Sequence, residues 1–495
     1  MRRVAAPFFA AILLPLAGCA PVSSPPQLQD SLGPALPATW ERASTATAPA
    51  DTTVDLYWWH SFNDPVLNRL MQDAQRGNLD LRIASARVLE AQALRSGSDA
   101  DLWPQFDATL DVTRADALER DGNGDGAATS GPRTLAQAGI AASWELDLSG
   151  RLRHVAAAAA ADEQALQADR TAVQLAVLGE VARNYIEYRL YVAQHALAKK
   201  NAEAQQSTVR ITQARFREGM ASRLDVERAQ TLLFNTQATV PQAAEQVEAA
   251  RARLQLLLAT SPQALAELMP YVPAPDPSAP VDTVGQAALA AIPAADAATV
   301  MLTPAEVLAQ RADVRAAERR LAAAAERLHA SGALRYPTLN LAGMIGVAST
   351  DVGQLFGSNN GQIWSANAGL LAPLFDFGRI RSQIDADDAR QQQAYLAYEQ
   401  TARGALTDVQ TAIVFYTQGV QRQQALADAV TAARKAAELA HRNYAQGTLS
   451  LLDVLVAERS QYDSELAWSQ ATADVALRLV SLWQALGVVP APLPT

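Results

Sequence analysis

The feature that most constrains this fold is an internal repeat whose two copies each contain a long segment without proline. Asn78–Arg82 matches Arg311–Arg315 at an offset of 233 residues, and further matches downstream are offset by 228 residues. Within the copies we expect one long helix each, over residues 151–218 and 379–446. A helix of this length spans on the order of 100 Å. No single globular core accommodates such rods, so they must pack sideways against other rods.

Each copy is predicted to run helix, two strands, long helix, turn, helix, which makes the fold class α+β, mainly α, with two structural repeats per chain. Between the helices the pattern changes to period two, as in Gln105–Thr113, where apolar and polar residues alternate. The strands are about 10 residues long, the length of a tilted transmembrane strand. Repeat 1 (61–260) contains helix 64–101, strands 105–114 and 134–146, helix 151–218 and helix 222–259; repeat 2 (304–487) contains helix 304–333, strands 338–348 and 363–371, helix 379–446 and helix 450–486.

Four aromatic residues lie near the ends of the predicted strands, where the aromatic girdle of a membrane barrel would be. Aromatic residues in a protein core would show the same pattern, so this placement favours membrane strands without deciding the matter. The four residues are Trp103, Trp144, Tyr336 and Trp364.

Four strands cannot close a barrel, and open strand edges do not survive in lipid. If the strands lie in a membrane, the chain must therefore oligomerise. Two chains would give eight strands, whose interior side chains fill, whereas three chains would give twelve, enough for a pore. The strand count leaves both assemblies open, and only the larger one provides a pore.

The first 19 residues have the layout of a bacterial lipoprotein leader. Two arginines precede an apolar stretch, Val4–Leu16, which is too short for a membrane span. The small residues before Cys19 look like a lipobox, so we predict a signal peptide over residues 1–18 and a covalent lipid on Cys19. The alternative is an ordinary leader followed by a chance cysteine. Because Ala20 follows instead of an aspartate, sorting to the outer membrane is favoured.

Three further segments carry no periodic signal. We interpret residues 19–60 as a lipidated N-terminal linker, the proline-rich residues 261–303 as an equatorial belt, and residues 488–495 as a C-terminal tail. No segment beyond the leader has 18 uninterrupted apolar residues, so no helical membrane span is predicted.

Composition and motifs argue against several other functions. The formal net charge is −10 and no basic run occurs, which argues against nucleic acid as a partner. The five histidines lack metal-ligand spacing, and no nucleotide-binding or hydrolase motif occurs, so neither enzymatic activity nor a cofactor is predicted beyond the lipid. Asp121–Gly126 imitates the start of an EF-hand loop, but its twelfth position is Pro132, which favours a solvated hairpin turn over a calcium site.

Several ordered motifs resemble the TolC-like outer membrane factors, and most closely the NodT-type lipoprotein branch of resistance-nodulation-division efflux systems. The resemblance covers nearly the whole mature chain. It implies a trimeric TolC-like α-barrel in the periplasm, a twelve-stranded outer-membrane β-barrel, and a tip that a periplasmic adaptor protein contacts and opens. The motifs are Trp59, Phe62, Asp64-Pro65, Asn78–Leu81, Trp144–Leu148 before Gly150-Arg151, Pro373–Asp376 before Gly378-Arg379, and the twin Gly…Leu-Asp-Val segments.

We therefore predict a passive exit duct of a tripartite efflux system, anchored in outer-membrane lipid and driven by an inner-membrane pump through the adaptor. A duct for type I protein export is an alternative, although the acyl anchor favours small-molecule efflux. An alternative of another class is a non-conducting, lipid-anchored periplasmic coiled-coil tether. A periplasmic hydrolase is disfavoured by the missing motifs.

Two turns lie one long helix away from the predicted strands and form the predicted helix tips. In each, a glycine ends one helix, a serine begins the next, and an aspartate three positions later fits the spacing of a capping box. The residues are Gly219, Ser222 and Asp225 in the first copy, and Gly447, Ser450 and Asp453 in the second.

The family resemblance implies a second role for one of these aspartates. By position, Asp453 would line the closed aperture of the tube, and Leu449, one turn earlier, would form an apolar constriction. Three chains would place three carboxylates in a ring that attracts cations. Some family members have a second acid three residues later, where this chain has Val456, so no double acidic ring is expected.

Overall fold

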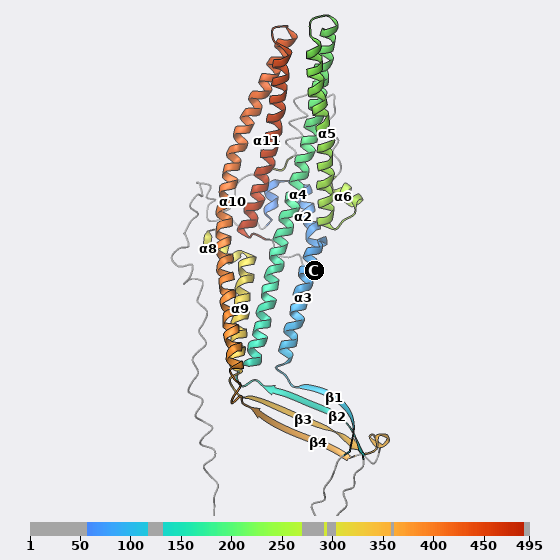
Figure 1. Cartoon of the computed structure of the whole chain (residues 1–495), viewed down its shortest axis with the longest axis vertical. Coiled ribbons are helices and arrows are strands. Elements are labelled where there is room, and N and C mark those ends of the chain that lie inside the picture. Colours follow the sequence, from blue (N-terminus) through green and yellow to red (C-terminus); the bar gives the residue numbers. More distant parts are fainter. Residues whose placement is uncertain (1–56, 117–131, 270–291, 295–302, 358–360, 490–495) are drawn as a thin grey trace, which may run out of the picture. The chain divides into compact units, whose positions relative to one another are not determined.

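The computed structural model describes residues 57–116, 132–269, 292–294, 303–357 and 361–489. Cys19 and the glycine-rich segment Asp121–Gly126 lie outside these residues. The elements of the first half are η2 (Trp58–Phe62), α2 (Pro65–Gly77), α3 (Leu79–Ala100), β1 (Gln105–Asp116), β2 (Pro132–Leu146), α4 (Arg151–Arg217), α5 (Arg223–Leu258) and α6 (Pro262–Leu268). Those of the second half are α8 (Pro304–Gln310), α9 (Ala312–Ala333), β3 (Thr338–Ser349), η3 (Val352–Gln354), β4 (Gly361–Leu371), α10 (Arg379–Ala445) and α11 (Leu451–Leu486) (Figure 1).

Corresponding helices in the two halves have equal lengths. The long helices α4 and α10 contain 67 residues each, α5 and α11 contain 36 each, and α3 and α9 contain 22 each. The order helix, two strands, long helix, turn, helix therefore occurs twice, and the α+β, mainly helical fold class is confirmed. Among the described residues, no helix is long and apolar enough to cross a membrane.

Where we predicted one helix over residues 64–101, the structure has two, because the helix breaks at Asn78. This residue has the extended ψ of 130° and closes α2. Its side-chain Oδ1 accepts a hydrogen bond from the backbone N–H of Leu81 at 3.1 Å, and its Nδ2 donates to the carbonyl of Leu257 at 2.8 Å. The same side chain thus caps α3 and fastens it to the end of α5.

The predicted helix 304–333 also breaks, at Arg311, which has ψ 125°. Its guanidinium donates to the carbonyl of Ala485 at 2.9 Å and pairs with Asp313 at 2.6 Å. The helix therefore stops at the residue whose side chain donates a hydrogen bond to a carbonyl group at the C-terminal end of α11. The first residues of the predicted linker 261–303 differ as well, since Ser261 caps the short helix α6.

The structure divides into two compact units. The first contains residues 89–165 and 317–399, and with them the sheet; the second contains the other halves of the long helices, with α2, α5, α8 and α11. The core of the second unit is built around Trp58, Trp59 and Tyr185, all fully buried. Tyr185 donates a hydrogen bond to Asp64 Oδ2 at 2.7 Å. The other carboxylate oxygen of Asp64, Oδ1, accepts a hydrogen bond from the backbone N–H of Val66 in the first turn of α2. Burial, together with the neighbouring carboxylate, raises the pKa of Tyr185.

The first unit contains one antiparallel four-stranded sheet in the order β1-β2-β3-β4 (Figure 1). Its central pair joins the two halves of the chain, because β2 pairs with β3 in a register that sets Gly139 opposite Gly346. Among the described residues, β1 pairs only with β2 and β4 only with β3. Two strand edges are therefore open in the single chain.

Candidate functional site

The sheet has one apolar face, which is exposed in the single chain. Residues that face each other across an antiparallel pair point to the same side, so the register assigns every residue to a face. Phe106 pairs with Ala142, Ala142 with Gly343, and Gly343 with Ala366. The exposed large side chains on the face that this row defines are Phe106, Leu110, Val112, Ile140, Ile345, Trp364 and Leu370.

The opposite face of the same sheet is mainly polar or small. It carries Gln105, Asp107, Thr109, Asp111, Thr113, Gln137, Asn340, Ser365 and Asn367 among others. A soluble sheet would bury its apolar face on a core, whereas here large apolar side chains meet solvent while polar ones occupy the other side. This is the pattern of a strand with one side in lipid and the other in water.

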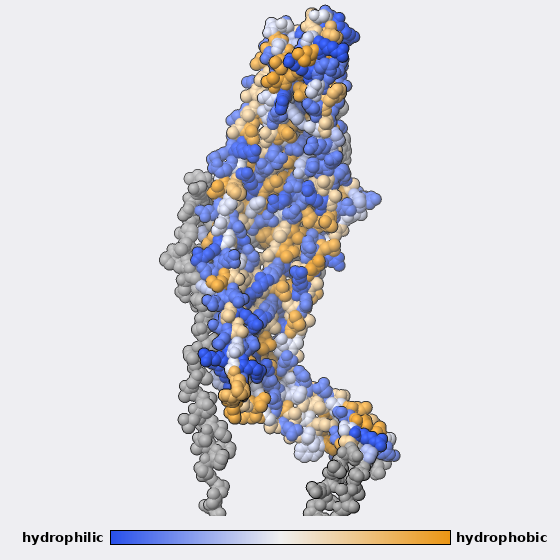
Figure 2. Space-filling view, viewed as in Figure 1, coloured by the Kyte–Doolittle hydropathy of each residue, from blue (hydrophilic) through white to orange (hydrophobic). Residues whose placement is uncertain are grey.

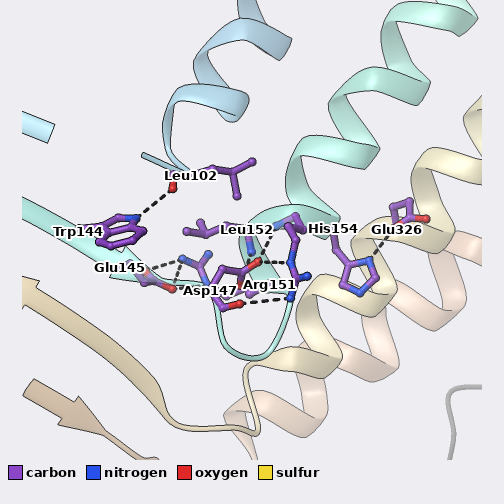
Figure 3. A network of polar contacts seen from close by, with 9 residues as sticks. Leu102, Trp144, Glu145, Asp147, Arg151, Leu152, His154 and Glu326 are labelled. Carbon is purple, nitrogen blue, oxygen red and sulfur yellow. Dashed lines mark hydrogen bonds and ion pairs between the residues drawn. The ribbon is translucent and has the colours of Figure 1, made fainter. Parts of the chain in front are cut away.

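The four aromatic residues of the predicted girdle lie in different surroundings. Trp364 is 79% exposed and Trp103 is 71% exposed, whereas Tyr336 lies at the border of exposure. Trp144 is half-buried, and its indole Nε1 donates to the carbonyl of Leu102 at 3.0 Å. All four flank or occupy the strands, and Trp144 has in addition the role of tying the end of β2 to the segment before β1 (Figure 3).

A polar network fixes the junction between β2 and α4 (Figure 3). Arg151 holds Glu145 with both Nε and Nη2, the latter at 2.8 Å, and Asp147 accepts hydrogen bonds from the backbone N–H groups of Leu152 and Arg153. Burial alone would raise the pKa of Asp147, but these N–H groups hold it below its usual value. The carboxylate thus caps α4 at its N-terminus, and the strand and the long helix are joined rigidly.

The two hairpin turns lie together in the second unit, at the ends of α4 and α10 (Figure 1). Gly219 and Gly447 have φ of 76° and 78°, a region that favours glycine. Each turn is closed by a hydrogen bond across the last helical turn, from Met220 N–H to Arg215 in the first and from Thr448 N–H to Asn443 in the second. Hydrophobic residues surround these turns at the surface (Figure 2), among them Met220, Leu224, Leu452 and Val456.

The two predicted capping aspartates are held differently. Ser222 and Asp225 form a complete capping box, in which the aspartate accepts from the serine N–H at 3.0 Å and from its hydroxyl at 2.8 Å. These hydrogen bonds lower the pKa of Asp225. Ser450 caps α11 and its hydroxyl donates to Asp453 at 2.6 Å, but among the described residues no bond from the Ser450 N–H is present. Asp453 is exposed and less tied to its cap than Asp225.

Leu449 is half-buried beside a small apolar cluster that holds the two hairpins together. The cluster takes Val209 from α4, Ala229 and Leu233 from α5, and Tyr444, Leu451 and Val454 from the second hairpin. Leu449 therefore packs on the tip itself, and Asp453, one turn later, projects from the same end of α11.

Polar contacts that the sequence did not reveal also join the hairpins. Arg215 lies over the ring of Tyr444, 4.3 Å from its centroid, and donates to the carbonyl of Ala445. Deeper in the hairpins, the buried Glu458 accepts a hydrogen bond from Thr208 of α4 and pairs with His441 of α10. A comparison of the two repeats would have signalled Glu458, since glutamine stands at the matching position 230.

Among the described residues, no group of histidine, cysteine, aspartate and glutamate side chains is arranged to hold a metal ion.

The sequence model of the outer membrane efflux protein family matches residues 70–260 and 303–488. The chain belongs to this family. A solved structure of the outer-membrane channel OprN superposes on this efflux protein with a TM-score of 0.81 and 30% sequence identity, covering 91% of this chain and 96% of that one.

Two relatives extend the comparison along the sequence. The pyoverdine export outer membrane protein OpmQ of Pseudomonas putida is 32% identical over 465 residues, covering 92% of this chain and 94% of that protein. Nodulation protein T of Rhizobium leguminosarum bv. trifolii is 26% identical over 487 residues, covering 98% and 97%. The predicted resemblance to NodT-type outer membrane factors is confirmed, and with it an outer-membrane efflux channel that is not an enzyme.

Proposed function

We propose that this efflux protein works as a homotrimer, in which three four-stranded sheets close a twelve-stranded barrel through the outer membrane and the long helices form a periplasmic α-barrel. The observation that carries this proposal is the sheet, with its apolar face exposed and both edge strands unpaired among the described residues. In lipid every backbone N–H and C=O needs a partner, and three copies that pair β4 with the next β1 would supply them.

The equal helix lengths in the two halves support two structural repeats per chain. Three chains would contribute six copies of the strand–helix unit, so α3, α4, α9 and α10 would recur around the ring at similar heights. Rods of 67 residues are each about 100 Å long, a length suited to a conduit that continues far beyond the membrane.

The same proposal assigns the remaining roles. Cys19 carries a lipid after the leader is removed, on the strength of the lipobox-like residues before it. A periplasmic adaptor protein engages the hairpin tips, where apolar residues are exposed beside polar ones. An inner-membrane pump, of the resistance-nodulation-division type, supplies the energy. Export of pyoverdine by the relative OpmQ favours small-molecule efflux over type I protein export.

Reconstitution of the mature, acylated chain tests the proposal. We expect a trimer that resists dissociation in detergent and forms ion-conducting channels in planar bilayers. A monomer that stays soluble without detergent would contradict the barrel. A stable trimer without conductance would favour the periplasmic tether instead.

Asp453→Asn separates the two roles of this residue. The N-cap of α11 is Ser450, which this substitution keeps, so trimer stability should change little, while the loss of three carboxylates at the aperture should lower the preference for cations. The measurement is the reversal potential in a salt gradient across a bilayer. Asp225→Asn is the matched control, since that aspartate sits in a complete capping box and should leave selectivity alone. Equal selectivity in wild type and Asp453→Asn would remove Asp453 from the gate.

A further inference from the structure

Glu458 is a buried carboxylate that contacts two helices besides its own. It lies on α11 and is only 7% exposed. Its Oε1 accepts a hydrogen bond from Thr208 Oγ1 of α4 at 2.7 Å and lies 3.0 Å from His441 Nε2 of α10. Its other oxygen, Oε2, is buried without a hydrogen-bond partner among the described residues. A charged carboxylate in this position depends on its few partners, because burial removes its solvation by water.

A second buried carboxylate lies two helical turns away on α11. Glu465 is fully buried and pairs with Arg434 of α10, whose Nε lies 2.6 Å from Glu465 Oε1. The two pairs follow the antiparallel register of the hairpin, since α11 advances by seven residues while α10 goes back by seven. We call His441–Glu458 and Arg434–Glu465 the charged seam. Its first pair also contacts α4, through Thr208.

The first hairpin has no such seam. At the offset of 228 residues, the positions of the four charged residues are occupied by glutamine, which is neutral at any pH. These are Gln206, Gln213, Gln230 and Gln237. The α4/α5 hairpin therefore has no ionisable side chain at these four positions, whereas the α10/α11 hairpin, which carries Leu449 and Asp453, has two ion pairs there.

We propose that His441 and Glu458 form a proton-sensitive latch that holds the α10/α11 hairpin against α4. The inference rests on the proposed function, in which a periplasmic adaptor protein engages the hairpin tips. With His441 protonated, the histidine charge balances the buried carboxylate, and Glu458 can keep its hydrogen bond to Thr208. With His441 neutral, the carboxylate is buried without a counter-charge, and moving the hairpin away from α4 restores its contact with water.

The described groups around the latch, apart from His441 and Glu458, are apolar or have partners of their own. The α5 residues packed in the tip cluster, Ala229 and Leu233, are apolar. Nearby charges are engaged elsewhere, since Arg442 pairs with Glu438, Arg459 with Asp463, Arg210 with Ser207, and Arg215 lies over Tyr444. The second pair of the charged seam contains an arginine in place of a histidine.

The direction of the effect follows from the histidine. The hydrogen bond to Glu458 raises the pKa of His441 against the opposing effect of burial. Its stabilising contribution is therefore complete below the unfolded pKa of about 6.5 and is lost as the pH rises through the higher folded value. Acidic surroundings should hold the latch closed, and alkaline surroundings should release the hairpin from α4 while Arg434–Glu465 keeps the hairpin itself together.

Hydrogen exchange of the full-length trimer tests the latch directly. Amide exchange over residues 201–212 and 451–458 is measured at about pH 5.5 and about pH 8.5, on either side of the ordinary histidine value, and divided by the intrinsic rate at each pH. We expect the normalised exchange of the wild type to rise at least about tenfold at the higher pH, which corresponds to about 1.4 kcal/mol. The double variant His441→Gln/Glu458→Gln, which copies the amides of the first hairpin, should show no rise.

Two further variants keep the test decisive. Thr208→Val removes the hydroxyl on α4 alone and should raise exchange at both pH values. Glu438→Gln removes one side of an exposed ion pair on α10. This variant should show the same rise in exchange at the higher pH as the wild type. A wild type without pH dependence, or a double variant that keeps it, overturns the latch.

Bilayer recordings of the same samples separate this inference from the proposed function. Channels that conduct, but with flat hydrogen exchange, would support the duct and refute the latch. Samples without conductance, but with a pH-dependent exchange that the double variant lacks, would refute the duct and leave the latch standing.

Discussion

Gly346→Ala is expected to remove most of the folded protein from the outer membrane. Gly346 lies on β3 opposite Gly139 of β2, at the seam between the two halves of the chain. A Cβ atom at position 346 would lie 2.7 Å from the Cα of Gly139 and closer still to the carbonyl oxygen of Ala138. Both are backbone atoms, so relief requires the ladder itself to open. We expect a cost of about 3 kcal/mol per chain, at the upper end for overpacking.

The matched control is Gly343→Ala on the same strand. A Cβ atom there would lie 3.4 Å from the carbonyl oxygen of Ser365, which is ordinary van der Waals contact. The measurement is the amount of heat-resistant trimer in the membrane fraction on gels run with and without boiling. Gly343→Ala should match the wild type, whereas Gly346→Ala should be strongly depleted. Equal depletion of both variants would show that a methyl group is harmful at either of these glycines and that the close approach of β2 and β3 is not the cause.

Local signals in the sequence were sufficient for the order of elements and for most of their bounds. The period-two alternation from Gln105 to Thr113 predicted β1, and glycine followed by serine predicted the turns at Gly219 and Gly447. Such signals work because alternation, capping and positive φ depend on residues a few positions apart. The strands proved slightly longer than expected, since pairing continues beyond the clean alternation.

The helix breaks at Asn78 and Arg311 could not be predicted in this way. Asn78 bonds to Leu257, which is 179 residues away, and Arg311 bonds to Ala485, 174 residues away. Within their own segments both residues are compatible with a continuous helix. At Asn78 the local cap of α3 contributes to the break, and at both residues a tertiary partner holds the chain in the non-helical conformation.

In the candidate site, too, local features could be predicted from the sequence and tertiary contacts could not. The sequence predicted the capping role of Asp225, which is local, but it could not tell that Asp453 lacks the second hydrogen bond of a capping box. It also gave no local sign that Glu458 and Glu465 are buried, because glutamate is usually solvated on a helix. The contrast with Gln230 and Gln237 in the first copy was visible in the sequence. The sequence alone did not show that the glutamates are buried against a neighbouring helix, so the contrast could not be interpreted without the structure.

Arg434→Met is expected to cause the largest local loss of stability in the hairpin tips. It leaves the Glu465 carboxylate, which has no exposed surface, without a counter-charge and with only the amide of Gln461 as a hydrogen-bond donor at 3.2 Å. Breaking one side of a buried ion pair costs about 3–5 kcal/mol. We therefore expect amide exchange along the C-terminal part of α10 and the facing part of α11 to rise by several orders of magnitude at neutral pH, while the sheet is unaffected.

The second substitution Glu465→Gln should restore most of this loss, because it removes the buried charge and keeps an acceptor for Gln461. Arg442→Met is the control on the same helix, since its pair with Glu438 is exposed and such pairs contribute about 0.5 kcal/mol or less. If Arg434→Met were no more damaging than Arg442→Met, Glu465 would have to reach water in the native trimer. If Glu465→Gln failed to rescue it, the loss would come from the packing of the arginine stem and not from the charge. Rescue by the neutral amide, which the first hairpin already has at position 237, would show that α10/α11 bears a charge its fold does not require.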